Sequence, residues 1–438
     1  MNGQLRLLGV RRFLPLFTAQ TLGAFEDNLF KSAFIMLVTY SPAMKSAFNP
    51  GALAAIAGGV LIAPYFLFSA TAGELADRFE RARLLQVLKA AEGLTVLAAA
   101  AALLADSIGL CFLALFALGA QATFSSPVRY ALLPQHLAAG ELVGGNALLE
   151  GGTFLAILVG TIAGAVATAL DGGTVLAIVL LALCAGGGFG ASLLVPPAPA
   201  PSPGLALSRN PLAASGAILR QSWRRREVRL AILGTSWFWL AGAVYLSQIP
   251  EFAKATLGAG SGVVTLFLAA FSVGVAIGSM LCGRLMKGEI SARYGPVAAF
   301  GMAVFSLDLA LAGGGVRPPA SGQLLGIVGF LSQAAGIRIF ADLLAIAVCG
   351  GFFVVPLYAI VQRLSEEAAR ARIIAAGNIV NALAMTAGAG ATALLIAAGL
   401  ATPQLYFVLG IMNAAVAVWS CKLVPGDGLR FLPRILRR

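Results

Sequence analysis

Twelve runs of about 20 or more apolar residues recur along this chain of 438 residues, with polar turns between them. A helix of that length crosses the ~30 Å hydrocarbon core of a bilayer and satisfies its own backbone hydrogen bonds there. We place the runs near residues 12–41, 51–74, 82–105, 107–133, 141–169, 174–195, 227–250, 260–285, 293–314, 338–363, 369–399 and 402–424. The sequence therefore predicts an all-α membrane protein with twelve transmembrane helices and both termini on one side.

The charged residues indicate which side that is. They make up 11% of the chain, where soluble domains carry about 25%, and the mean hydropathy is +0.90. Most Lys and Arg lie in alternate loops, the middle linker and the two ends, whereas the opposite loops hold only Lys45, Lys254, Arg317 and Arg338. By the positive-inside rule both termini are cytoplasmic. We interpret the net charge of +12 as topology and contact with anionic lipid of the bilayer, and we expect no nucleic-acid partner.

A proline-rich stretch divides the chain into halves. Residues 196–203 read PPAPAPSP and are followed by Arg220 and the run 224–226, which favours an extended cytoplasmic linker. We predict a six-helix bundle over residues 1–196, a linker over 197–226, and a second six-helix bundle with a basic cytoplasmic tail over 227–438. This is the layout of the major facilitator fold.

An internal repeat supports that division. Pro127 precedes Asn146 by 19 residues, and Pro356 precedes Asn378 by 22, in corresponding places of the two halves. Such a parallel repeat is expected when two halves are related about the membrane normal. The spacing of Gly160 and Gly164 favours close helix packing.

The turn after the second run contains a candidate cytoplasmic gate. Gly73, Asp77, Arg78 and Arg83 match the motif of the major facilitator superfamily at this loop. We expect Asp77 to pair with nearby cations and to latch the cytoplasmic side.

The first apolar run carries four polar side chains in its middle. Glu26, Asp27, Asn28 and Lys31 are costly at bilayer depth, by roughly 3 kcal/mol for each charge, so they are expected to face a bundle interior or a water-filled path. Asp27 and Lys31 are spaced to pair along the helix. Asp27 is either a substrate or coupling group or a structural partner of Lys31, and Glu26 is an alternative inward acid.

Other in-span polar groups of the first half are Lys89, Glu92, Arg129, Tyr130, Asn146, Glu150 and Thr153. We interpret Lys89 and Glu92 as a satisfied helical pair. Arg129 fits either phosphate contact or an inner gate. Glu150 is either a substrate group or a partner of Arg129.

The second half is predicted to be more apolar. Trp237, Phe238 and Trp239 form an aromatic wall for an acyl chain, although packing is an alternative. We expect Asp342 to pair with Arg338 at the surface. A charged wall facing an apolar one suits an amphipathic zwitterion.

Catalytic motifs are not found. His136 is the single histidine, so an HExxH site is impossible, and neither GxSxG nor GxxxxGK occurs. The five cysteines show no CxxC spacing. We predict a protein that is not an enzyme, with no metal site and no cofactor.

Five segments in order resemble the bacterial lysophospholipid transporter family. They are residues 24–28 (AFEDN), 126–134 (SPVRYALLP), 145–150 (GNALLE), 234–239 (GTSWFW) and 350–356 (GGFFVVP). The resemblance implies flipping of lysophospholipids, mainly lysophosphatidylethanolamine, from the outer to the inner leaflet of the bacterial inner membrane. It also implies functional coupling to an acyltransferase/acyl-acyl-carrier-protein synthetase that reacylates them.

The resemblance further implies roles for single residues. The polar motif of the family's first helix falls on Asp27 and Asn28, its basic position in the fourth helix on Arg129, and its acid in the fifth on Glu150. The seventh helix departs from free-standing members, which have an Arg where this chain is apolar around Leu246. In that helix the chain is more similar to the transporter portion of fused transporter–acyltransferase–synthetase proteins, so it is either a free-standing relative or part of such a fusion.

We expect a monomer that works by alternating access, with the headgroup held by the first half. The alternatives are a proton-coupled drug or small-solute exporter of the same fold and a membrane scaffold for an acylation complex. Coupling to protons, to sodium or to no ion stays open at this point.

Overall fold

The computed structural model describes residues 3–40, 50–168, 170–316 and 323–424. Lys45, Arg317 and the basic tail from residue 425 onward lie outside this part of the chain. The long helices are α1 (Leu14–Tyr40), α2 (Pro50–Arg78), α3 (Arg81–Leu104), α4 (Ile108–His136), α5 (Leu142–Thr168), α6 (Gly173–Leu193), α8 (Arg226–Glu251), α9 (Ser261–Met286), α10 (Gly295–Gly315), α12 (Ala334–Leu364), α13 (Arg370–Ala397) and α14 (Thr402–Ser420). The shorter ones are η1 (Leu5–Gly9), α7 (Pro211–Trp223) and α11 (Ile327–Leu331).

The predicted all-helical membrane fold is confirmed, because each of the twelve expected spans is found in one long helix. Eleven helices of the described chain are long and apolar enough to cross a membrane. The twelfth, α1, has 27 residues and carries three charged side chains near its middle. Large apolar side chains such as Leu94, Leu183 and Val418 lie exposed on the outside of the bundle, as a lipid-facing surface requires.

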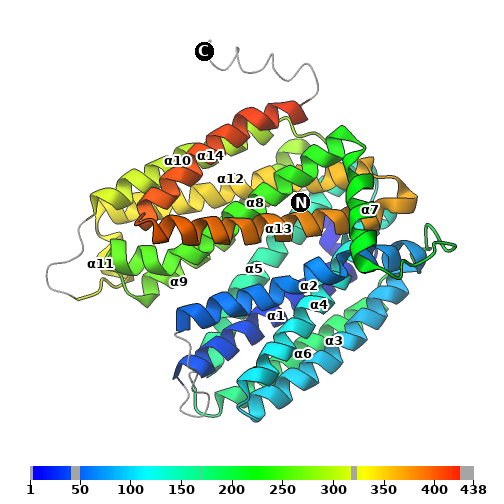
Figure 1. The fold of residues 1–438 in the computed structure, drawn as a ribbon, viewed down its shortest axis with the longest axis horizontal. Coiled ribbons are helices and arrows are strands. Elements are labelled where there is room, and N and C mark those ends of the chain that lie inside the picture. The colour runs from blue at the N-terminus through cyan, green and yellow to red at the C-terminus, as the bar shows by residue number, and fades with distance from the viewer. Residues whose placement is uncertain (1–2, 41–49, 169, 317–322, 425–438) are drawn as a thin grey trace.

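Contacts between helices divide the molecule into two groups. Helices α1 to α6 pack mainly on one another, and so do α8 to α10 with α12 to α14. Figure 1 shows the first group, blue to cyan, below the second, green to red. The two groups meet along two seams, one between α2 and α13 and one between α5 and α9.

Small residues bring the helices of the first half together. A Cβ atom on Gly160 would lie 2.3 Å from the backbone oxygen of Phe25, and one on Gly164 would lie 2.3 Å from that of Leu29. The close approach predicted from this spacing is therefore confirmed, between α5 and α1.

The segment between the halves is partly helical. Residues 196–210 run without regular structure, and then α7 begins with Asn210 as its N-cap and Pro211 in its first turn. Ala214 and Ile218 of α7 pack with Ala70 of α2 and with Ala375 and Ile379 of α13. Helix α7 thus covers the α2–α13 seam at one end of the molecule, which we call the linker end (Figure 1).

Candidate functional site

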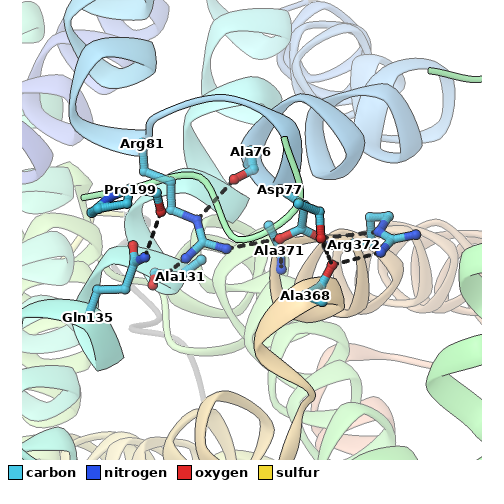
Figure 2. Close-up of polar contacts among 10 residues, drawn as sticks. Ala76, Asp77, Arg81, Ala131, Gln135, Pro199, Ala368, Ala371 and Arg372 are labelled. Atoms are coloured by element: carbon cyan, nitrogen blue, oxygen red, sulfur yellow. Dashed lines mark hydrogen bonds and ion pairs between the residues drawn. The ribbon is translucent and has the colours of Figure 1, made fainter. Parts of the chain in front are cut away.

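Asp77, the last acidic residue of α2, joins the two halves at the linker end (Figure 2). Its side chain is fully buried and pairs with Arg81 at 2.9 Å and with Arg372 of the other half at 3.1 Å. It also accepts hydrogen bonds from the backbone N–H groups of Ala371 and Arg372, at 3.1 and 3.2 Å. These amides open α13, so a carboxylate of one half caps the positive end of a helix in the other.

Arg81 holds Asp77 in place from within the first half. Its side chain is fully buried and donates to the backbone oxygens of Ala76 and Ala131 besides its ion pair with Asp77. Gly73 permits the contact, since a Cβ atom there would lie 2.8 Å from atoms of both Ala375 and Arg372.

The two basic residues singled out from the motif lie elsewhere. Arg78 stacks its guanidinium over the ring of Phe79, 5.4 Å from the centroid. Arg83 is exposed, and its backbone N–H is held by the Glu80 carboxylate at 2.7 Å. The cations that contact Asp77 are Arg81 and Arg372.

The linker crosses this latch and is bonded to both halves. The backbone N–H of Ser202 donates to the backbone carbonyl oxygen of Asp77. The Ser202 hydroxyl donates to the backbone carbonyl oxygen of Ala368 in the second half. The backbone N–H of Ala198 donates to the Glu80 carboxylate at 2.6 Å. The α2–α13 seam is therefore closed at the linker end by side chains and by linker backbone together.

The repeated asparagines also bridge the halves. The side chains of Asn146 in α5 and Gln362 in α12 exchange two hydrogen bonds, at 2.7 and 2.9 Å. Asn378 in α13 donates to Ser126 in α4 at 2.9 Å. The repeated asparagine of each half thus contacts the helix that carries the repeated proline of the other half. This gives the sequence repeat a structural role.

Two hydrogen bonds and one pair of stacked rings connect the two halves in the middle of the protein. Tyr130 of α4 donates to the Glu150 carboxylate of α5, and its ring stacks on Tyr358 of α12 with centroids 4.9 Å apart. Trp239 of α8 donates to the hydroxyl of Tyr358 at 2.8 Å. Glu150 is thus linked to the second half through two tyrosines, and Arg129 forms no ion pair with it in the described chain.

The aromatic residues of α8 divide between two environments. Trp239 stacks on Phe154 of α5, with centroids 6.1 Å apart, and Phe238 meets the same ring edge-on at 6.0 Å. Trp237 instead donates to Asn413 of α14 at 2.9 Å. Phe238 and Trp239 therefore face the first half, whereas Trp237 is held within the second.

Four of the polar side chains that remain partly exposed within the helices of the first half interact with one another. They are Asp27 and Lys31 of α1, Tyr65 of α2 and Arg129 of α4. Electrostatic interactions connect Arg129 with both Asp27 and Tyr65. Arg129 has no hydrogen-bonding partner among the described residues, so its guanidinium is available to an anionic group.

The ion pair between Asp27 and Lys31 that the spacing allowed is not formed within bonding distance, although the two groups interact electrostatically. The Lys31 ammonium donates to Asn28 at 3.2 Å, and Asn28 in turn donates to the backbone oxygen of Ala24. The rotamer of Lys31 places its ammonium on the amide at the i,i+3 position, one residue nearer along the helix than Asp27.

Glu26 is turned to the other side of α1, into the first bundle. It is fully buried and lies against the ion pair of Lys89 and Glu92, which is confirmed with a separation of 2.6 Å. In the second half, Arg338 pairs with Asp308 of α10, while Asp342 is buried. The expected Asp342–Arg338 surface pair is therefore wrong, because Asp308 lies closer across the helix interface.

Three residues of this arrangement were not identified from the sequence. Tyr358, Gln362 and Arg372 contribute to the bridges between halves, yet each lies in a helix whose sequence is otherwise ordinary. The internal repeat could have pointed to Gln362, since it lies between the repeated Pro356 and Asn378. Within the described residues, no group of three or more His, Cys, Asp and Glu is placed to hold a metal ion.

Comparisons with known proteins agree on one family. The sequence model of the Major Facilitator Superfamily matches residues 28–389. A protein named lysophospholipid transporter LplT from Klebsiella pneumoniae is 28% identical over 93% of this chain and 95% of its own length. A protein of the same name from Salmonella newport is 29% identical over 84% of this chain and 82% of its own length.

Solved structures share the fold at lower sequence identity. The proton:xylose symporter XylE is 16% identical, with a TM-score of 0.68 over 95% of this chain and 96% of its own. The human organic anion transporter MFSD10 is 13% identical, with a TM-score of 0.70 over 93% of this chain and 99% of its own.

Proposed function

The chain belongs to the major facilitator superfamily, and from that premise we propose that it moves lysophospholipids across the bacterial inner membrane. The observation that carries the proposal is the pairing of the two walls. Ionisable groups of both signs remain partly exposed at mid-span on the first half, and aromatic rings of α8 face that half. The similar proteins that bear the name of lysophospholipid transporter agree with this chemistry.

The headgroup would be held by the first half. Arg129 has no hydrogen-bonding partner among the described residues and can bind the phosphate through a charge-assisted hydrogen bond. Asp27 can take an ammonium, which favours lysophosphatidylethanolamine over headgroups without a cation. Asn28 directly follows Asp27, Lys31 lies one turn further along the same helix, and both complete the polar wall.

The acyl chain would lie against the second half. Phe238 and Trp239 present apolar ring surface beside Phe154, and Trp239 is fixed by its bond to Tyr358. Glu150 contacts Tyr130, Tyr130 stacks on Tyr358, and Tyr358 is bonded to Trp239. Movement of the aromatic wall would therefore be transmitted to Glu150.

Alternating access would follow from rocking of the halves. The described structure is closed at the linker end by Asp77, by the linker and by the Asn146–Gln362 bridge. We take that end as cytoplasmic, because the linker and adjoining turns are rich in Lys and Arg. Lipid would then enter from the outer leaflet and leave to the inner one, where an acyltransferase/acyl-acyl-carrier-protein synthetase consumes it.

The test is uptake of labelled lysophosphatidylethanolamine from the outer leaflet of liposomes that contain the purified protein. We expect wild-type movement well above empty liposomes, and a loss of at least tenfold in Asp27→Asn and Arg129→Ala, about 1.4 kcal/mol or more of lost interaction. The control is Glu251→Gln, an exposed change in the second half that keeps wild-type rates.

Two results would overturn the proposal. A folded wild-type protein that moves no lysophospholipid would favour a small-solute exporter, to be tested next with polar substrates. Copurification with acyltransferase activity, without lipid movement by the isolated chain, would favour a scaffold.

A further inference from the structure

A second polar cluster lies inside the first bundle, behind the candidate headgroup wall. Glu26 of α1, Lys89 and Glu92 of α3 and Gln121 of α4 meet there, and the three charged side chains are at most 2% exposed. The Lys89 ammonium donates to both oxygens of Glu92, at 2.6 and 2.8 Å, and the Gln121 amide donates to the same carboxylate.

The bundle leaves room for this cluster by means of two glycines. A Cβ atom on Gly23 of α1 would lie 2.8 Å from the Lys89 nitrogen, and one on Gly188 of α6 would lie 3.5 Å from it. Any side chain at Gly23 would displace the ammonium. The packing around Lys89 thus accommodates a charged group, although a bundle core normally excludes charge.

The cluster lacks one hydrogen-bond donor unless a carboxyl group carries a proton. Glu92 accepts three hydrogen bonds, two from Lys89 and one from Gln121, and is neutralised by Lys89, so it is accounted for as an anion. Neither oxygen of Glu26 has a donor in the described chain, and its polar neighbour is the Glu92 carboxyl. Two carboxyl groups in contact form a hydrogen bond only when one of them carries a proton.

We propose that Glu26 and Glu92 form a proton-binding site, held by Lys89 and Gln121, whose occupancy sets the charge beside the headgroup wall. With the proton bound to Glu26, the cluster is neutral and Glu26 donates to Glu92. Loss of the proton leaves one uncompensated negative charge. Titration of two carboxyl groups this strongly coupled is a property of the pair and not of either residue alone.

The connection to the headgroup wall runs through Asp27. It follows Glu26 in α1 and interacts electrostatically with Lys89 and Glu92 of α3 and with Arg129 of α4. Cys184 of α6 also faces the cluster and interacts with Glu26. From α5, Glu150 interacts with Arg129. An added negative charge at Glu26 strengthens the hold on an ammonium headgroup and slows its release.

The proton site is tested without any lipid substrate, by infrared spectroscopy of the purified full chain during a pH titration. We expect a protonated-carboxyl C=O band in the wild type that is lost as the pH rises. Glu26→Gln keeps the shape and the donor to Glu92, and should lack this band at every pH. The matched control is Asp342→Asn, because Asp342 is also a buried acid beside a second acid, Asp308, and a cation, Arg338, but these two neighbours are partly exposed. This control should keep the band.

A second variant protects the test against misfolding of the first. In Glu92→Gln, Glu26 loses its repulsion from the Glu92 carboxylate and keeps its attraction to the Lys89 ammonium, so Glu26 should ionise and the band should again be lost. Retention of the band in Glu26→Gln or Glu92→Gln, or its loss in Asp342→Asn, would overturn the assignment.

The effect on transport rests on the proposed function and is measured separately in liposomes. We expect wild-type lysophosphatidylethanolamine movement to slow by about tenfold from about pH 6 to about pH 9, since one charge is added near Asp27. Movement by Glu26→Gln should vary by less than about twofold over that range. A pH dependence that survives in Glu26→Gln would refute the link. A wild type that shows the band but moves no lipid would refute the proposed function and leave the proton site standing.

Discussion

The interiors of the two bundles both contain polar side chains, but of opposite kinds. The first bundle encloses three charged groups and an amide, namely Glu26, Lys89, Glu92 and Gln121. The second encloses a neutral network around Asn413, which accepts from Trp237 at 2.9 Å and donates to Tyr245 at 3.1 Å and to Ser306 at 3.3 Å.

The difference lies in how completely each set is satisfied. Asn413 uses its carbonyl oxygen and its amide together, and replacing the whole network by apolar groups would cost little. The charged cluster leaves Glu26 without a donor, which a purely structural core would avoid. The polar centres of the two bundles thus differ in role. The network of the second bundle holds its helices together, whereas the cluster of the first contains ionisable groups.

The sharpest way to test this contrast is to remove the one cation of the charged cluster. Lys89→Met leaves Glu92 buried and unpaired, and we expect it to lower the free energy of unfolding by about 3–5 kcal/mol. The measurement is thermal unfolding of the detergent-purified protein. Lys254→Met, at an exposed position of the second half, should stay within about 0.5 kcal/mol of wild type.

The double variant Lys89→Met with Glu92→Gln separates charge from packing. If the loss comes from an uncompensated carboxylate, the second change should restore most of it. A double variant as unstable as the single one would indicate lost packing around the lysine stem and would remove the electrostatic contrast between the bundles.

The seam between the halves shows the same contrast on a smaller scale. Asp77→Ala removes an ion pair and two backbone bonds across the α2–α13 seam, so the first turn of α13 should open more easily by about 2–3 kcal/mol. Hydrogen exchange at the amides of Ala371 and Arg372 measures this. Gln362→Leu removes the neutral bridge to Asn146 and should leave exchange at those two amides near wild type; equal acceleration by both would mean that the seam opens as one unit.

These contrasts also mark what the sequence could predict. Twelve apolar runs dictate helices, because a lipid-exposed backbone must bond to itself, and the charges of residues 26–31 stand out against them. The pairing of those charges depended on rotamers and on neighbouring helices. Lys31 reaches Asn28 and not Asp27, and Arg338 reaches Asp308 and not Asp342.

The long-range partners were beyond a single sequence for the same reason. Asp77 was predicted to meet cations, and it does, but Arg372 lies 295 residues away and nothing local distinguishes it. Gln121 could not be placed beside Glu92 without knowing that α3 and α4 pack together. Neighbours along one helix could be predicted from their spacing in the sequence, whereas contacts between helices could not.

The neutral network of the second bundle should tolerate loss better than the charged cluster. Asn413→Leu leaves Trp237 without its acceptor but keeps the bond between Tyr245 and Ser306, so we expect a loss of about 1–2 kcal/mol in thermal unfolding. Lipid movement should keep the pH dependence of wild type. A loss of stability as large as that of Lys89→Met would show that the importance of a buried polar group here depends on whether its hydrogen bonds are made, and not on its charge.

The smallest expected effect separates two tryptophans that are two residues apart. Trp237→Phe removes one donor inside the second bundle and should cost about 1 kcal/mol or less, with lipid movement within about twofold of wild type. Trp239→Phe removes the bond to Tyr358, and with it the fixed ring beside Phe154, so movement should fall several-fold while stability changes equally little. Both are measured by unfolding and by liposome uptake. The pair matters because the two changes are chemically identical, so a difference in transport reports the direction each ring faces. If both variants slow transport alike, the acyl-chain wall includes Trp237, and the second bundle's interior is not merely structural.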